Sequence, residues 1–157
     1  MANQMRWRTG DAAPVMAAVL SATEIEIGDL VYLDAGTAKP AALQADAGTK
    51  AGNQENFHDK FLGVALQRSR AGDTAPVRVA TRGQFEFDCA AATFELGNLL
   101  GVSENVGGTA LLNQQIEVVA TANLAIGRCM KRSATSKTTV TVEIVSTALH
   151  GGPMTMA

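Results

Sequence analysis

The sequence predicts an all-β fold, a small β-barrel or sandwich of two pseudo-repeated β units, with at most one or two short helices and extended terminal arms. Three observations support this prediction. Many short segments alternate polar and apolar residues, which is the period of a half-buried strand. β-branched and aromatic residues gather in these segments, and Gly-Asp or Gly-Asn pairs separate them. Similar segments also return in the same order in the two halves of the chain.

The chain begins with a segment that has no regular period. Residues 1–20 are predicted to be an N-terminal arm, because Gly10 and Pro14 interrupt any helix or strand and the alanines offer little surface for packing. Residues 24–27 alternate polar and apolar side chains and are predicted to be a strand. A Gly-Asp turn follows, and residues 30–33 are predicted to be a second short strand.

The middle of the chain combines a polar segment with three apolar ones. Residues 44–60 are rich in Ala, Gly, Asn and Asp and have no period, so we predict a long exposed loop. Residues 61–66 form a nearly continuous apolar run of strand length. Residues 77–81 and 85–87 alternate again, which predicts a hairpin with its bend near Arg82.

The second half contains one predicted helix and four predicted strands. Asp88 is a suitable N-cap for a short helix over the alanine-rich residues 89–92. The clearest strand signal is a run of β-branched residues with a strict period of two near the carboxyl end. The four predicted strands are residues 99–102, 115–119, 125–130 and 138–145.

The predicted organisation is one β-rich domain, residues 21–148, between the N-terminal arm and a C-terminal tail, residues 149–157. Within this domain the pseudo-repeats cover about residues 24–87 and 93–146. The matching segments are 26–31 with 95–100, 62–69 with 126–133, and 77–79 with 140–142, at offsets of 69, 64 and 63 residues.

Composition and charge disfavour several classes of protein. Of 157 residues, 27 are alanine and 44 are large apolar residues, so the core is thin and self-association would stabilise it. The net charge of -2 disfavours a nucleic-acid surface, which needs basic side chains to neutralise phosphates. No apolar run approaches the roughly 18 residues that span a bilayer, and no signal-like apolar stretch follows the first basic residues. We therefore expect no nucleic-acid partner, no membrane and synthesis in a reducing cytoplasm.

The residues that most often carry chemistry are sparse. His58 and His150 have no neighbouring nucleophile, so both are predicted to be solvated. Cys89 and Cys129 are predicted to be small buried hydrophobes, although a bridge between them stays open. An acidic set lacks the spacing of a calcium loop and is predicted to be a solvated strand face. It consists of Glu24, Glu26, Asp29 and Asp34. We predict no enzymatic activity, no catalytic residue, no metal site and no cofactor.

The order of the short motifs resembles the head decoration, or cement, proteins of tailed bacteriophages. The similarity covers roughly residues 24–100. Its motifs are a Gly-Asp turn into a strand at 28–33, Leu-Gly-Val-Ala at 62–65, a Gly-Asp turn at 72–73, the strand at 77–81, and Gly-Gln-Phe-Glu-Phe at 83–87. The resemblance implies a β-rich structural protein without enzymatic activity, which binds the major capsid protein on the outer surface of the virion. It also implies a homo-oligomer, a trimer in preference to a dimer.

The predicted N-terminal arm contains candidate contact residues. An arm can add a strand to the sheet edge of a neighbouring subunit, and Trp and Arg are favoured contact residues. The candidates for capsid or intersubunit contact are Arg6, Trp7, Arg8, Val15 and Met16.

Two other classes of function stay open. A carbohydrate-binding β module on a virion or cell surface would also lack catalytic motifs, but it usually displays several aromatic side chains and this chain has seven in all. A small oligomeric β enzyme would carry an active site between subunits that a single sequence does not reveal.

Overall fold

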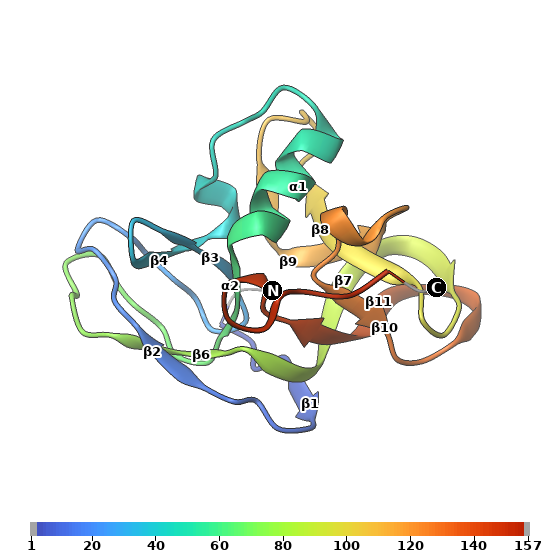
Figure 1. The fold of residues 1–157 in the computed structure, drawn as a ribbon, viewed down its shortest axis with the longest axis horizontal. Coiled ribbons are helices and arrows are strands. Elements are labelled where there is room, and N and C mark those ends of the chain that lie inside the picture. The colour runs from blue at the N-terminus through green and yellow to red at the C-terminus, as the bar shows by residue number, and fades with distance from the viewer. Residues whose placement is uncertain (1–2, 156–157) are drawn as a thin grey trace.

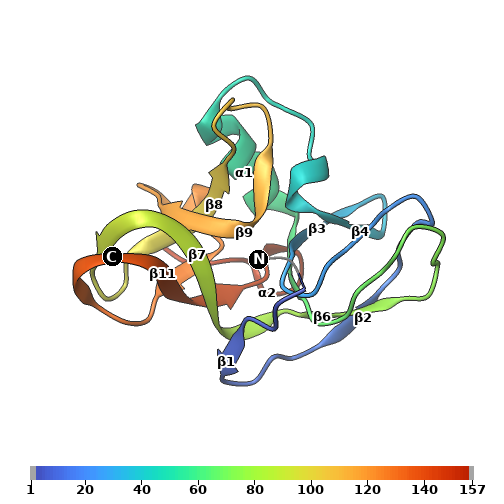
Figure 2. The ribbon, with the colours of Figure 1, turned by 180° about the vertical axis from the view of Figure 1, so that it is seen from behind.

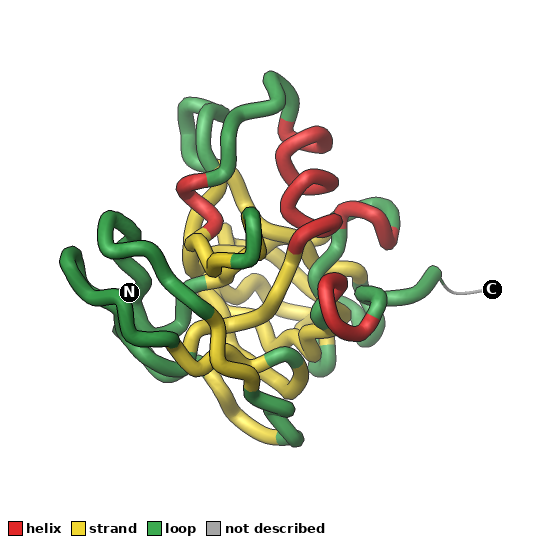
Figure 3. Tube along the Cα trace, turned by 60° about the vertical axis from the view of Figure 1, so that its left-hand side comes forward, coloured by secondary structure: helices red, strands yellow, loops and turns green. Residues whose placement is uncertain are grey.

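A computed structural model describes residues 3–155 (Figure 1). Its strands form two sheets and its two α-helices are short, so the all-β prediction is confirmed for the described range. The first sheet lies at the left of Figure 1 and the second at the right, and the helices lie at the periphery of the strands (Figure 3). The predicted arm and tail also include residues 1–2 and 156–157, which lie outside the described range.

The first sheet has the strand order β2-β6-β5-β3-β4. In that order its strands are β2 (Val15–Ala17), β6 (Val77–Ala80), β5 (Phe61–Ala65), β3 (Leu30–Asp34) and β4 (Thr37–Pro40). A parallel bridge between Ala18 and Thr37 joins the two outer strands, and we call the resulting ring of strands the first barrel. The predicted strands at 30–33, 61–66 and 77–81 are confirmed.

The second sheet has the strand order β1-β7-β11-β10-β8-β9. Its strands are β1 (Trp7–Thr9), β7 (Arg82–Phe94), β11 (Ser133–Val145), β10 (Gly127–Cys129), β8 (Leu99–Glu104) and β9 (Leu111–Val118). A parallel pairing of Asp88 with Gln115 joins β7 to β9 and closes five of these strands into the second barrel. β1 is added to the outside of β7, as Figure 2 shows.

The two barrels repeat one strand arrangement. The order β2-β6-β5-β3-β4 of the first barrel corresponds strand by strand to the order β7-β11-β10-β8-β9 of the second. The residue pairs between neighbouring strands correspond as well. The equivalent pairs are Val31–Gly63 and Leu100–Gly127, Ala65–Val79 and Cys129–Val142, and Val15–Val79 and Phe85–Val142. The closing bridges Ala18–Thr37 and Asp88–Gln115 are equivalent as well. The repeated unit therefore has five strands and begins at β2 and β7.

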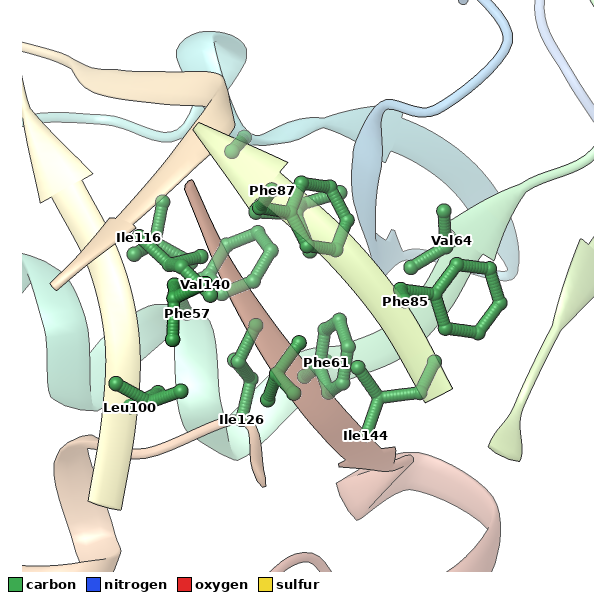
Figure 4. Packing of buried hydrophobic residues seen from close by; sticks show 14 of the residues in the cluster. Phe57, Phe61, Val64, Phe85, Phe87, Leu100, Ile116, Ile126, Val140 and Ile144 are labelled. Carbon is green, nitrogen blue, oxygen red and sulfur yellow. The ribbon is translucent and has the colours of Figure 1, made fainter. Parts of the chain in front are cut away.

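The buried side chains form two clusters of unequal size. The cluster of the first barrel contains small residues such as Ala17 and Ala65. The larger cluster contains Phe85 and Phe87, which point toward the apolar residues of neighbouring elements (Figure 4). Because Ala17 pairs with β6 as Phe87 pairs with β11, an alanine in the first barrel takes the place of a phenylalanine in the second. The first barrel therefore buries a smaller side chain at this position than the second.

The structure corrects the predicted loop at residues 44–60. Eleven of these residues form α1 (Lys50–Lys60), and the Thr49 side chain caps its first turn by accepting from the Gly52 N–H. The helix buries polar residues through hydrogen bonds: Gln54 Nε2 donates to the Val102 carbonyl at 2.9 Å. No apolar stripe is needed to hold such a helix. The other helical elements are η1 (Ala41–Leu43), η2 (Ala122–Leu124) and α2 (Thr147–His150).

Three other local predictions are wrong. Residues 89–92 are part of strand β7 and not a helix after Asp88, because β7 continues its alternating burial and its pairing with β11. β6 and β7 belong to different sheets, so no hairpin bends near Arg82. Residues 24–27 do not form a strand but make a single bridge, from Ile25 to Ser69. The other predicted strands of the second half are confirmed, with ends that differ by at most five residues.

The N-terminal segment is part of the body of the protein. β1 pairs with β7 and β2 pairs with β6, so both short strands lie in the sheets of their own chain. This corrects the expectation that residues 1–20 reach away to a neighbour: β2 closes the first barrel, and its backbone groups are bonded there. At the other end, residues 149–155 also contact the body, where Gly152 and Pro153 are buried.

Candidate contact surface

Arg6, predicted to contact a neighbouring molecule, is a buried residue. Only 2% of it is exposed, and its guanidinium lies 5.6 Å from the centre of the Phe87 ring. It donates to both carboxylate oxygens of Asp88, at 3.2 and 3.1 Å, and to Gln114 Oε1 at 2.9 Å. These contacts use the fork geometry of the guanidinium. The prediction of an external contact is therefore wrong for Arg6, because the side chain fastens β1 to the second barrel.

The network around Arg6 also connects the two barrels. Gln114 lies in β9, and its Nε2 donates to Asp29 Oδ1 at 2.8 Å, just before β3. Hydrogen bonds from Arg6 lower the pKa of Asp88, whereas burial raises the pKa of Asp29. Polar side chains therefore connect strand β1 and the second barrel to Asp29, which directly precedes strand β3 of the first barrel.

Replacing Arg6 with methionine is expected to lower the free energy of unfolding by about 2 kcal/mol, because the bonds to Asp88 and Gln114 are lost while Asp88 keeps some access to water. The pairing stabilises the fold at neutral pH, and this stabilisation is lost as the pH falls through the lowered pKa of Asp88. Urea denaturation followed by circular dichroism measures both effects. Arg8→Met is the control, since Arg8 is 41% exposed, and a change within about 0.5 kcal/mol is expected. Equal losses in the two variants would contradict a special role for Arg6.

The other predicted contact residues divide by exposure. Trp7, Arg8 and Met16 are exposed, whereas Val15 is half-buried against the cluster of the first barrel. The Trp7 indole N–H donates to the Gly10 carbonyl at 3.0 Å, which fixes the ring at the surface. Arg8 bonds Glu86 at 3.4 Å. Three of the five predicted residues are therefore available to a partner.

Trp7 borders an apolar groove of about 450 Å³ that sequence reasoning did not predict. Its lining comes from three distant segments of the chain: Met5, Trp7, Ala12, Leu66, Gln67 and Arg78. Met16 pairs directly with Arg78 across strands β2 and β6, so it continues the same outer face. We call these seven residues the Trp7 surface. Local sequence gives no sign of it, because only the pairing of β1 with β7 brings Met5 and Trp7 beside β6.

The Trp7 surface exposes large apolar side chains. Met5 is 47% exposed, Trp7 41% and Met16 59%. Aromatic, methionine and arginine side chains are enriched in protein interfaces, and Trp in particular supplies much of their binding energy. The surface is shallow and has no convergent set of polar groups. It can therefore bind another protein by burial of apolar area, with Arg78 at its edge for polar contacts.

The remaining candidate residues have structural surroundings. Cys89 and Cys129 are free and buried, as predicted, and no bridge joins them. His58 is half-buried, and its Nδ1 lies 2.7 Å from the Ala125 carbonyl oxygen, so it is not the solvated residue predicted. His150 is exposed, with Nε2 3.0 Å from the Thr81 hydroxyl.

The side chains of the acidic set make separate interactions and do not gather into a cation site. Glu26 pairs with Arg68 at 3.1 Å, and Asp34 pairs with Lys39 at 2.6 Å. Within residues 3–155, no group of three or more His, Cys, Asp or Glu side chains has the proximity that a metal ion requires. No helix in that range has the length and apolar character needed to cross a membrane.

Comparison with family models, with curated proteins and with solved structures finds no match for this chain.

Proposed function

We propose that the protein is a head decoration protein of a tailed bacteriophage, which binds the outer surface of the capsid and holds neighbouring major capsid proteins together. The Trp7 surface carries this proposal, because it is an exposed apolar face on an otherwise closed pair of barrels. The motif order that resembles decoration proteins supports the same partner. Binding on the virion surface requires adhesion and no bond-making chemistry.

The proposal assigns the contact to residues that are exposed and rigidly placed. β1 is the edge strand of its sheet: β7 pairs with it on one side, and the Arg8 guanidinium donates to the Met5 and Trp7 carbonyls at 3.2 Å. Trp7 and Met16 lie on strands of the two sheets, so a partner that covers both side chains would contact both sheets at once. A loop would hold these side chains less precisely.

We also propose that the protein acts as a homo-oligomer, a trimer in preference to a dimer. Several modest contacts made by one rigid assembly bind together, and linkage raises affinity by about 10²–10⁴ fold. A thin core gains most from such association. Native mass spectrometry is expected to give a mass three times the 16.3 kDa of the chain.

Capsid binding by the Trp7 surface is testable with expanded, undecorated heads of the phage whose genome encodes the chain. Wild-type protein is expected to appear as symmetry-related density in cryo-electron microscopy. Trp7→Ala combined with Met16→Ala is expected to reduce occupancy at least 10-fold, because the central apolar contacts are removed. Thermal unfolding should change little, since both side chains are exposed.

A matched control distinguishes this surface from apolar exposure in general. Leu96 is 68% exposed and lies outside the Trp7 surface, so Leu96→Ala is expected to keep full occupancy. Full occupancy by the Trp7 and Met16 double variant would contradict the proposed surface. Absence of wild-type binding would overturn the decoration function, and a positive glycan array or nucleotide-hydrolysis screen would then favour the carbohydrate-binding or enzyme alternative.

A further inference from the structure

A second hollow lies on the second barrel, and its chemistry differs from that of the Trp7 surface. It measures about 480 Å³ and is formed by the turn between β10 and β11, by residues 133–141 of β11 and by two residues of β7. We call it the Lys131 hollow. Its lining residues are Glu86, Phe94, Lys131, Arg132, Ser133, Lys137, Thr139, Val140 and Thr141.

The internal repeat relates the Lys131 hollow to the Trp7 surface. Glu86 pairs with Thr141 in the second barrel as Met16 pairs with Arg78 in the first. Lys131 matches Gln67 in the aligned repeats. Three residues of the hollow therefore correspond to three residues of the Trp7 surface. The same outer face occurs twice in the chain, once apolar and once charged.

The Lys131 hollow is positively charged. Lys131, Arg132 and Lys137 supply three cations against the single carboxylate of Glu86, which already bonds Arg8. Arg132 bonds Glu95 at 2.8 Å, but both side chains are 61% exposed, so water screens the pair. In the described part of the chain, Lys131 and Lys137 have no carboxylate partner within 4.0 Å.

The backbone of β11 shapes this face. Its pairing with β7 shifts register on both sides of Lys137, and residues 134–139 are exposed. Such irregularities turn side chains away from the regular strand direction and end the pairing locally. Ser133, Thr139 and Thr141 place hydroxyl groups around the same hollow.

We propose that the Lys131 hollow binds an acidic peptide segment of a partner protein. Carboxylates complement the two lysines that have no partner, and the hydroxyl groups offer hydrogen bonds to a peptide backbone. A nucleic acid fits less well, because the one aromatic ring in the lining, Phe94, is only 2% exposed and offers no stacking face.

The test uses the purified chain and a fluorescein-labelled hexaglutamate peptide in fluorescence anisotropy, so it does not depend on capsid binding. Binding is expected in 50 mM NaCl and should weaken as salt is raised. Lys131→Glu with Lys137→Glu should weaken the affinity at least 10-fold. Lys131→Gln with Lys137→Gln should weaken it by a smaller factor, and it provides a second measurement should charge reversal disturb folding.

Arg70→Glu with Arg82→Glu changes the net charge by the same amount at two exposed positions outside the hollow, and it should weaken the affinity less than 2-fold. The proposal fails if wild-type protein does not bind hexaglutamate, or if the two charge-reversal variants lose affinity equally. It also fails if a labelled dodecathymidylate binds more tightly than the peptide and loses affinity in the Lys131 and Lys137 variant, because the ligand would then be a phosphate chain.

Discussion

Alanine at position 63 or 127 is expected to destabilise the protein by about 3 kcal/mol or more. A Cβ atom on Gly63 would lie 1.8 Å from the Ala80 carbonyl oxygen, and one on Gly127 would lie 2.0 Å from that of Glu143. Both oxygens belong to the backbone of the neighbouring strand, so the clash is relieved only if the strands separate. Because the two sites are equivalent in the repeats, both substitutions should have large effects. Urea denaturation followed by circular dichroism measures them.

Gly107→Ala is the control for the two strand glycines. A Cβ atom at this position would have its nearest neighbour, Thr109 Oγ1, at 3.8 Å, which is ordinary contact. We expect a change within about 0.5 kcal/mol. Wild-type stability of the Gly63→Ala or Gly127→Ala variant would mean that these strand pairs do not approach as the structure describes.

These glycines show what the sequence reveals about the repeat. The similarity of residues 62–69 to 126–133 was visible in the sequence, and Gly63 and Gly127 stand at matching places in it. Alternation predicted the strands because each has one face toward a core. The similar sequence segments do not include β2 and β7. Ala17 of β2 nevertheless pairs with β6 in the same register as Phe87 of β7 pairs with β11. The full five-strand unit therefore became visible only from strand pairing.

The helix and the Cys89 segment show why other elements were missed. α1 buries Asn53 and Gln54 beside a single aromatic residue, Phe57, so no apolar stripe marks it. Asn53 Nδ2 donates to Glu104 Oε1 at 2.7 Å, a contact between residues 51 positions apart. In β7, alanine propensity suggested a helix, but the barrel imposes the strand. Long-range pairing decided both elements, and local sequence does not contain it.

The candidate contact surface was predictable only in part. Trp7, Arg8 and Met16 were selected from their residue types, and all three are exposed. Arg6 was selected on the same grounds, yet Asp88 and Gln114 hold it inside. Those partners are 82 and 108 positions away in the chain, so no local pattern distinguishes the buried Arg6 from its exposed neighbours.

The outer faces of the two barrels have diverged in a way that explains their arrangement. Leu30 and Val64 on the first barrel belong to the large buried cluster shared with the second. Val64 pairs with Leu30 as Arg128 pairs with Leu99, so an arginine stands in the second barrel where the first has a buried valine. The first barrel thus packs against the second through Leu30 and Val64. The equivalent residues of the second barrel, Leu99 and Arg128, are not part of the buried cluster. The first barrel therefore depends on this contact with the second to bury Leu30 and Val64.

Removal of residues 1–20 is expected to unfold the first barrel. The remaining chain should then no longer unfold in a single cooperative transition. The deletion removes β2, and with it Ala17 and Val19 from the smaller buried cluster. It also leaves the β6 edge unpaired, which favours aggregation, and removes Arg6 from the barrel junction. Circular dichroism during urea denaturation, together with size-exclusion chromatography, measures the loss.

A chain that begins at Met5 is the matched control for this deletion. It keeps β1, β2 and Arg6, and it loses a hydrogen bond in which Asn3 Oδ1 accepts from the Ile27 N–H at 3.1 Å. We expect it to unfold cooperatively with a loss of about 1 kcal/mol. A native-like, cooperative chain of residues 21–157 would instead identify the first twenty residues as a dispensable arm. Because the deletion is expected to unfold a barrel, loss of capsid binding in that chain would not identify a contact. The exposed side chains of Trp7 and Met16 must therefore be changed singly and together in the intact fold.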